Sequence, residues 1–241
     1  GGTKIAGGVV DEAGAIIART RRDTPSTDPR AIVHSIVSVV QELRHGREIA
    51  AVGIGSAGFV DAARSTVLFA PNLAWRNVAV RAQVVAATDL PVVVENDANA
   101  AAWGEFRFGV AEDVDDMVCV TVGTGIGGGL VLDGAVYRGA HGVGAELGHM
   151  RVVPNGHLCG CGNRGCLEQY ASGQALVREA RAIASAGSAF AARLLELAGG
   201  DPEKITGPMV TGAARDGDSA SQELLTDLGR WLGEGLASFA A

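Results

Sequence analysis

The chain has 241 residues, of which 47% are hydrophobic and 20% are charged, a composition typical of a globular protein with a sizeable core. Its formal net charge of -7 argues against a surface built for nucleic-acid phosphates or anionic lipid, and no apolar run approaches membrane-spanning length. No signal peptide is visible, so we expect a cytoplasmic protein that binds neither nucleic acid nor membrane.

The chain opens with a predicted hairpin directly after a Gly-Gly-Thr-Lys run at 1–4. Residues 5–10 and 15–22 have the composition of two strands, and Asp-Glu-Ala-Gly at 11–14 supplies the turn between them. The same arrangement, a glycine-containing run followed by a hairpin, recurs later in the chain.

A helix is predicted next, over 29–44, because its apolar residues recur at helical spacing on one face. That face consists of Ile32, Val33, Ile36, Val37, Val40 and Leu43. We expect a strand over 49–54, a loop over 55–61 and a second helix over 78–88.

Asp97 lies between a predicted buried strand over 91–95 and a predicted alanine-rich helix over 97–108. The end of a strand in an open α/β sheet is where ligands bind, and the following helix N-terminus favours an ionised carboxylate. Asp97 therefore suits a general base that accepts a proton from a substrate hydroxyl. The alternative is that Asp97 only caps the helix.

The second hairpin is predicted from 117 to 137. Strands over 117–122 and 128–132 flank a glycine turn at 123–127, and a third strand is expected at 135–137. Thr124 and Gly125 lie in this turn, and the backbone N–H groups of such a glycine-rich turn could bind phosphate oxygens. Two glycine turns that each lead into a hairpin are what a duplicated ribonuclease-H-like fold would give, although two unrelated hairpins would give the same pattern.

Three of the four cysteines, Cys159, Cys161 and Cys166, follow His149 within a short glycine-rich segment. Three thiolates and an imidazole form the closed ligand set of a structural zinc site. The alternatives are a disulfide with a spare thiol, or buried free cysteines. An odd number of clustered thiols without a secretory signal favours zinc.

The zinc loop includes or is flanked by Glu146, His149 and Glu168, whose side chains can form charge-assisted hydrogen bonds to a ligand. The remainder of the chain is predicted to be helical. The expected helices cover 173–185, 189–197, 208–215 and 219 to the end.

The Cys-Gly-Cys-Gly-x-x-Gly-Cys-x-Glu run at 159–168 resembles the signature of the ROK family of bacterial sugar kinases and sugar-responsive repressors. The runs at 1–4, 95–99 and 123–129 also stand in the order of this family, and the segment 139–173 is most similar to bacterial glucokinases. The resemblance therefore extends over the whole chain.

This resemblance implies an ATP-dependent phosphorylation of glucose, with Mg²⁺ accompanying ATP. It implies an α/β fold of the duplicated ribonuclease-H-like, actin-like and hexokinase type, with domains at 1–109 and 110–241 and a cleft between them. It also suggests a homo-oligomer, either a dimer or a tetramer. An opening acidic residue and strand, and an adenosine-binding segment, are expected outside residues 1–241.

The resemblance also assigns residues to roles. Asp97 corresponds to the base and Asn96 to a sugar contact, while Gly58 and Asn72 match positions that line the sugar pocket. In a sugar kinase each side chain of the zinc-loop set would bond a sugar hydroxyl, namely Glu146, His149 and Glu168. Trp75 could either form a wall of that pocket or belong to the core. The implied ATP-binding residues are Gly2, Thr3, Lys4, Thr124 and Gly125.

Two alternatives remain open within this family. One is a sugar-responsive transcriptional repressor, although intact phosphate loops favour an enzyme. The other is a kinase for fructose, mannose, N-acetylmannosamine or allose.

Overall fold

The structure, a computed structural model, describes residues 4–71 and 73–240. The chain divides into two compact units, one of residues 1–120 with 128–145 and the other of residues 121–127 with 146–241. The domain boundary predicted at 109/110 stays a prediction, because compactness does not show which segments fold as independent domains. Each unit is described by itself.

The first unit begins with the predicted hairpin, formed by β1 (Lys4–Val10) and β2 (Ile16–Asp23) in antiparallel pairing. Helix α1 (Pro29–Arg44) follows, and its bounds confirm the helix predicted over 29–44. Asp28 fixes its start, because its carboxylate accepts the backbone N–H groups of Arg30 at 2.9 Å and Ala31 at 3.2 Å.

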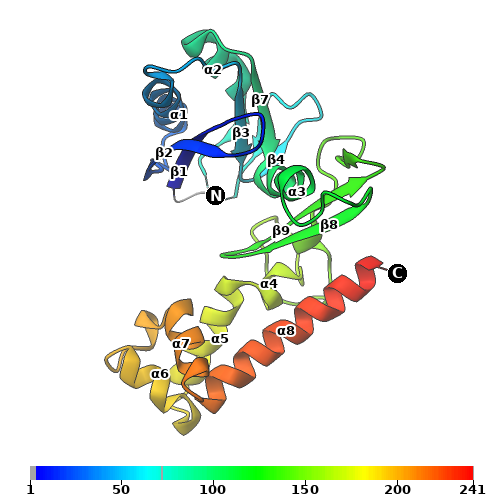
Figure 1. Cartoon of the computed structure of the whole chain (residues 1–241). Helices are drawn as coiled ribbons and strands as arrows, with labels where there is room; N and C mark the ends of the chain where they lie inside the picture. The colour runs from blue at the N-terminus through cyan, green and yellow to red at the C-terminus, as the bar shows by residue number, and fades with distance from the viewer. Residues whose placement is uncertain (1–3, 72, 241) are drawn as a thin grey trace. The chain divides into compact units, whose positions relative to one another are not determined.

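Two parallel strands, β3 (Val52–Ser56) and β7 (Val92–Asn96), lie at the centre of this unit (Figure 1). Val92 and Val94 of β7 belong to a core that also includes side chains of α1 and of α2 (Val80–Thr88). Helix α3 (Asp97–Phe108) contacts both strands. Strand β3 lies two to three residues later than the strand predicted over 49–54, because its pairing begins where the Val52 N–H meets the Pro91 carbonyl.

A small antiparallel sheet that the sequence did not predict joins β4 (Phe59–Val60), β5 (Val67–Phe69) and β6 (Arg76–Val78). Trp75, which precedes β6, is 1% exposed and donates its indole N–H to the Pro29 carbonyl at 3.2 Å. Trp75 is therefore a core residue.

A further three-stranded sheet has the order β10 (Ala135–Val136), β9 (Ile126–Leu132) and β8 (Met117–Val122), in agreement with the predicted second hairpin.

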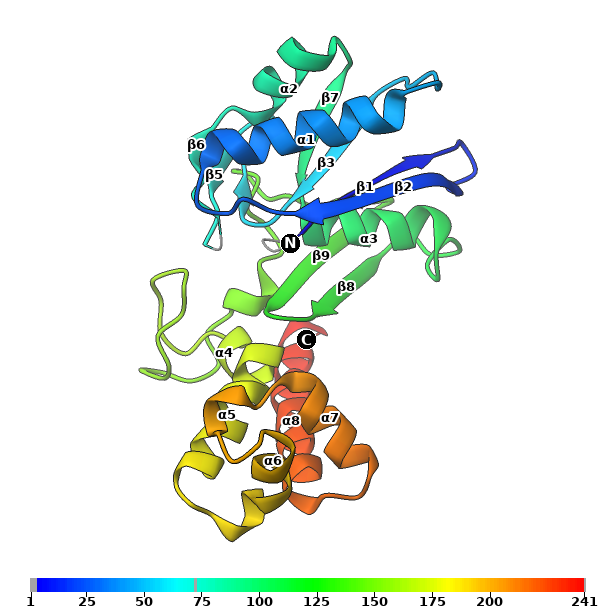
Figure 2. The same ribbon diagram turned by 90° about the vertical axis from the view of Figure 1, so that its left-hand side faces the viewer.

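The second unit is mainly helical, and its long last helix packs along several of the others (Figure 2). Its elements are η1 (Leu147–His149), α4 (Glu168–Ala171), α5 (Gly173–Ser185), η2 (Ala189–Ala191), α6 (Ala192–Leu197), η3 (Pro202–Lys204), α7 (Gly207–Arg215) and α8 (Ser219–Ala240). Among the described residues, none of the helices is both long and apolar enough to cross a membrane.

Candidate active site and metal centre

Asp97 occupies the first position of α3, immediately after β7. The capping residue is Asn96, whose side-chain oxygen accepts the N–H groups of Ala98 at 2.9 Å and Asn99 at 3.0 Å. Because Asn96 already performs the capping, the hypothesis that Asp97 serves only as the N-cap is wrong. The Asp97 carboxylate accepts the Ala98 N–H at 3.0 Å, which holds it at the positive end of the helix.

Gly58 orients Asn96. Its carbonyl accepts a hydrogen bond from the Asn96 side-chain amide at 3.1 Å, which leaves the amide oxygen facing α3. Gly58 has φ of +99°, and a side chain there would meet the backbone of Phe69 and Ala70. The backbone of Gly58 thus supports the predicted sugar contact, while Asn72 lies outside the described residues.

Gly58→Ala is expected to destabilise the protein by roughly 1–3 kcal/mol or more, through backbone strain and overlap with Phe69. Urea unfolding measures the effect. Gly46→Ala is the matched control, because Gly46 also has positive φ (+70°) but nothing lies within 4 Å of the added methyl group. Equal losses in the two variants would contradict the packing part of this prediction.

The second unit brings together the predicted metal ligands. The ligand atoms of His149, Cys159, Cys161 and Cys166 all lie within 4.8 Å of one another. The Cys159 sulfur lies 3.5 Å from Nδ1 of His149, and the Cys161 and Cys166 sulfurs are 3.7 Å apart. This cluster could hold one metal ion by four ligands.

Burial and hydrogen bonding together shift the pKa values of these thiols. Burial raises the pKa of Cys166 to about 12 and also raises the pKa of Cys159. Burial acts in the same direction on Cys161, but hydrogen bonds from the Asn163 backbone and the neighbouring thiols leave its pKa lowered. A metal ion bound here must therefore displace protons, and its binding must weaken as pH falls.

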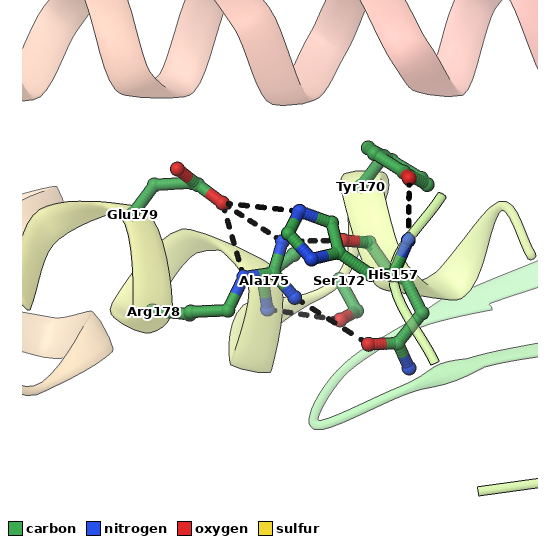
Figure 3. A network of polar contacts seen from close by, with 7 residues as sticks. His157, Tyr170, Ser172, Ala175, Arg178 and Glu179 are labelled. Atoms are coloured by element: carbon green, nitrogen blue, oxygen red, sulfur yellow. Dashed lines mark hydrogen bonds and ion pairs between the residues drawn. The ribbon is translucent and has the colours of Figure 1, made fainter. Parts of the chain in front are cut away.

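The metal loop is folded by its own backbone and by one aromatic anchor. The Cys159 N–H donates to the Asn163 carbonyl at 2.8 Å, and Gly165, with φ of +79°, brings the chain back beside Val153. The His157 backbone N–H donates to the Tyr170 hydroxyl at 3.0 Å (Figure 3). The centroids of the two rings are 5.3 Å apart.

Tyr170 also packs against α8, since its ring centroid lies 4.9 Å from that of Trp231 in this helix. Beside it, Arg178 donates to the Gln169 carbonyl at 2.6 Å and pairs with Glu179 at 2.8 Å (Figure 3). The aromatic contacts attach the loop to the helices of its own unit, and Arg178 joins α5 to α4.

Glu168 links the metal loop to the glycine turn. One carboxylate oxygen accepts the Ile126 N–H at 3.1 Å, and the other lies 3.8 Å from the Cys159 sulfur. His149 contacts the same sulfur and donates its backbone N–H to the Glu146 carbonyl at 3.0 Å. The structure therefore brings His149 and Glu168 to the same sulfur and places Glu168 against the glycine turn, while Glu146 precedes His149 by one short turn.

The glycine turn is held by the start of α5. The Gly173 N–H donates to the Gly123 carbonyl at 2.8 Å, and the Gln174 N–H donates to the Thr124 carbonyl at 3.2 Å. A cavity of about 750 Å³ lies against these residues. It is also lined by Arg178, Arg181 and Glu203. Both arginines are ion-paired, Arg178 with Glu179 at 2.8 Å and Arg181 with Glu203 at 3.1 Å.

The sequence did not identify Gln174, Arg178 or Arg181 as cavity residues, because an amphipathic helix pattern does not show which residues face a cavity.

Of the predicted ATP-binding residues in the first unit, Gly2 and Thr3 lie outside the described residues. Lys4 forms an ion pair with Asp23 across the first hairpin.

Comparison with known proteins gives consistent matches. The family model of the ROK family matches residues 1–241. The glucokinase of Streptomyces coelicolor is 52% identical over all of this chain and 76% of its own length. The crystal structure of a ROK family glucokinase from Streptomyces griseus, in complex with glucose and AMPPNP, matches with a TM-score of 0.90 and 52% identity, covering 100% of this chain and 77% of that one.

A ROK family transcriptional regulator of known structure also matches, with a TM-score of 0.83 and 31% identity, covering 98% of this chain and 59% of that one. The fold is thus that of ROK proteins, kinases and regulators alike. Because the family model covers the entire chain and the Streptomyces coelicolor glucokinase is 52% identical to it, the chain belongs to the ROK family.

Proposed function

We propose that this chain is an ATP-dependent glucokinase, which transfers the γ-phosphoryl group of ATP to glucose and forms glucose 6-phosphate and ADP. The observation that carries the proposal is the whole-chain match to a glucokinase crystallised with glucose and AMPPNP. Mg²⁺ bound with ATP would neutralise phosphate charge. In the same proposal, the two hairpins that follow glycine-containing runs belong to a duplicated ribonuclease-H-like ATPase fold.

Asp97 acts as the general base. Its carboxylate takes the proton of the reacting glucose hydroxyl while that oxygen attacks the γ-phosphorus, and the bond from the γ-phosphorus to the bridging oxygen breaks to release ADP. The fixed position of Asp97 at the start of α3, next to the anchored Asn96 amide, supports this role.

The other proposed sugar-binding residues are Asn96 in the first unit and Glu146, His149 and Glu168 in the second. The geometry supports this for His149 and Glu168 in particular, because both side chains contact the Cys159 sulfur. Thr124 and Gly125 bind the phosphates of ATP, and the adjoining cavity with Arg178 and Arg181 accommodates part of the nucleotide. Gly2, Thr3 and Lys4 are also proposed to bind ATP.

The metal is zinc in this proposal. Zinc–sulfur bonds of ~2.3 Å and zinc–nitrogen bonds of ~2.0–2.1 Å in a tetrahedron require sulfur–sulfur edges of ~3.8 Å and sulfur–nitrogen edges of ~3.6 Å. Two of the six separations in the cluster, 3.7 Å and 3.5 Å, match these edges, and all ligand atoms lie within 4.8 Å of one another. His149, Cys159, Cys161 and Cys166 would hold the ion, whose contribution is structural.

The direct test is a phosphorylation assay of the purified protein with ATP and a panel of acceptors: glucose, fructose, mannose, N-acetylmannosamine and allose. Glucose is expected to have the highest kcat/KM. A tenfold higher kcat/KM with another sugar would replace glucose as the substrate.

The second candidate is a sugar-responsive repressor, favoured by the match to a ROK family transcriptional regulator. A repressor needs a sugar site but no site for phosphate, so the glycine turn beside a cavity of about 750 Å³ favours the enzyme. Sugar binding by calorimetry without phosphorylation of any acceptor would support the repressor instead.

Gly125→Ala is expected to raise the KM for glucose by ~10–100-fold, the value of one hydrogen bond to a charged group. A methyl group at Gly125 would overlap the Glu168 carboxylate and displace it from the Ile126 N–H. Steady-state kinetics measure the change. At Gly123 an added methyl group has nothing within 4 Å, so Gly123→Ala should leave the glucose KM unaltered. Equal glucose KM values in the two variants would remove Glu168 from the sugar site.

A further inference from the structure

An ion pair lies next to the proposed base. Arg138, just beyond β10, donates from Nε at 2.8 Å and from its terminal guanidinium nitrogen at 2.7 Å to the same oxygen of Glu95. The side chains are only 27% and 13% exposed, so this is a partly buried pair with two charge-assisted bonds. Both residues belong to the first unit.

The other oxygen of Glu95 holds the segment that carries Asp97. It accepts the Asn96 backbone N–H at 3.1 Å and the Asn99 side-chain amide at 3.3 Å. Glu95 therefore fixes the residue before Asp97 and a residue of the first turn of α3. The Asn99 side chain is almost fully buried, so it has little freedom to compensate if Glu95 moves.

Arg138 is itself fixed at both ends. Its side chain donates to the Val136 carbonyl at 3.0 Å, and its carbonyl accepts the Gly144 N–H at 2.8 Å. A rigid guanidinium that forms two bonds to one carboxylate oxygen defines the orientation of that carboxylate more closely than a flexible ammonium can.

We propose that Arg138 is a positioning residue for glucose phosphorylation, which acts on Asp97 through Glu95. This inference rests on the proposed function. Without Arg138, the poorly solvated Glu95 carboxylate loses its counter-charge and turns toward other donors. The peptide between Glu95 and Asn96 then shifts, and the Asp97 carboxylate shifts with it. Displacement of a catalytic group by about 1 Å can cost ~10²-fold in rate.

The expected result for Arg138→Ala is a kcat lowered by ~10–100-fold, with the KM for ATP within about threefold of wild type. Arg138→Lys should fall between Ala and wild type, because a lysine restores charge but not the paired bonds. Arg22→Ala is the matched control. Arg22 is similarly exposed, at 34%, and pairs with Glu42 outside the 95–99 segment, so its loss should leave kcat unchanged.

Two measurements separate positioning from general destabilisation. The first combines Arg138→Ala with Asp97→Asn. If Arg138 works through Asp97, its loss adds less than about threefold to the defect of Asp97→Asn, whereas independent effects would multiply. If Arg138→Ala does not yield folded protein, Arg138→Lys takes its place in this comparison.

The second measurement is chemical rescue. Arg138 and Glu95 line a cavity of about 710 Å³, so added guanidinium ion has a route to the vacated place in Arg138→Ala. Guanidinium at tens of millimolar should restore kcat at least threefold, while sodium at equal ionic strength should not. A kcat for Arg138→Ala or Arg138→Lys equal to wild type, or a defect that multiplies fully with that of Asp97→Asn, would overturn the inference. A wild-type protein without glucokinase activity would instead refute the proposed function, and the inference with it.

Discussion

Asp97→Asn is expected to lower kcat for glucose phosphorylation by ~10²–10⁴-fold, the usual contribution of a positioned general base. The amide keeps the size of the side chain and can still accept the Ala98 N–H, but it cannot take the proton of the glucose hydroxyl. Glucose binding, measured by calorimetry, should remain within a few-fold of wild type, because the substitution removes a step in the reaction more than a ground-state contact.

Asp28→Asn provides the control for this substitution. Asp28 is also a carboxylate at a helix N-terminus in the first unit, where it caps α1, and asparagine caps a helix about as well as aspartate. Its kcat should equal that of wild type. Retention of more than a tenth of wild-type kcat by Asp97→Asn at saturating glucose would remove Asp97 from the role of base.

Cys166→Ser is expected to abolish zinc binding and to lower glucose affinity by tenfold or more, with ATP affinity altered much less. Cys166 is completely buried in the cluster, and structural zinc sites have apparent binding free energies of ~10–16 kcal/mol, so removal of one ligand should disorder the loop. His149 and Glu168 both contact the Cys159 sulfur, so disorder there reaches two proposed sugar partners directly.

Elemental analysis of zinc and calorimetric titration with glucose measure the two effects on the same samples. Cys119→Ser is the control, because Cys119 lies in β8 and is not part of the four-residue cluster. Wild-type protein without zinc would refute the metal site. Zinc-free Cys166→Ser with wild-type glucose affinity would refute only the coupling between metal and sugar.

The sequence predicted best those elements whose boundaries are set by local chemistry. Helices α1, α3 and α5 have the predicted bounds because Asp28, Asn96 and Ser172 cap their first turns. The metal cluster was also predictable, since its ligands lie within one short segment and glycines such as Gly165 allow the necessary turns.

Features that depend on residues distant in sequence were missed. Strands β4, β5 and β6 have two or three residues each, too few for a period to be recognised, and they are defined by pairing with one another. The role of Trp75 was left open because its partner, the Pro29 carbonyl, lies 46 residues away. The pairing of Glu95 with Arg138 spans 43 residues and likewise has no local signature.

The cap at the start of α3 has a consequence for the release of product. A helix N-terminus normally attracts phosphate because several N–H groups are free to bind it. Here the Asn96 side chain already occupies the N–H groups of Ala98 and Asn99. The end of α3 can thus receive a neutral sugar hydroxyl beside Asp97 but offers few donors to a phosphate ester. Glucose 6-phosphate would therefore meet repulsion from the aspartate without compensating bonds from the helix, which favours its departure over tight product inhibition.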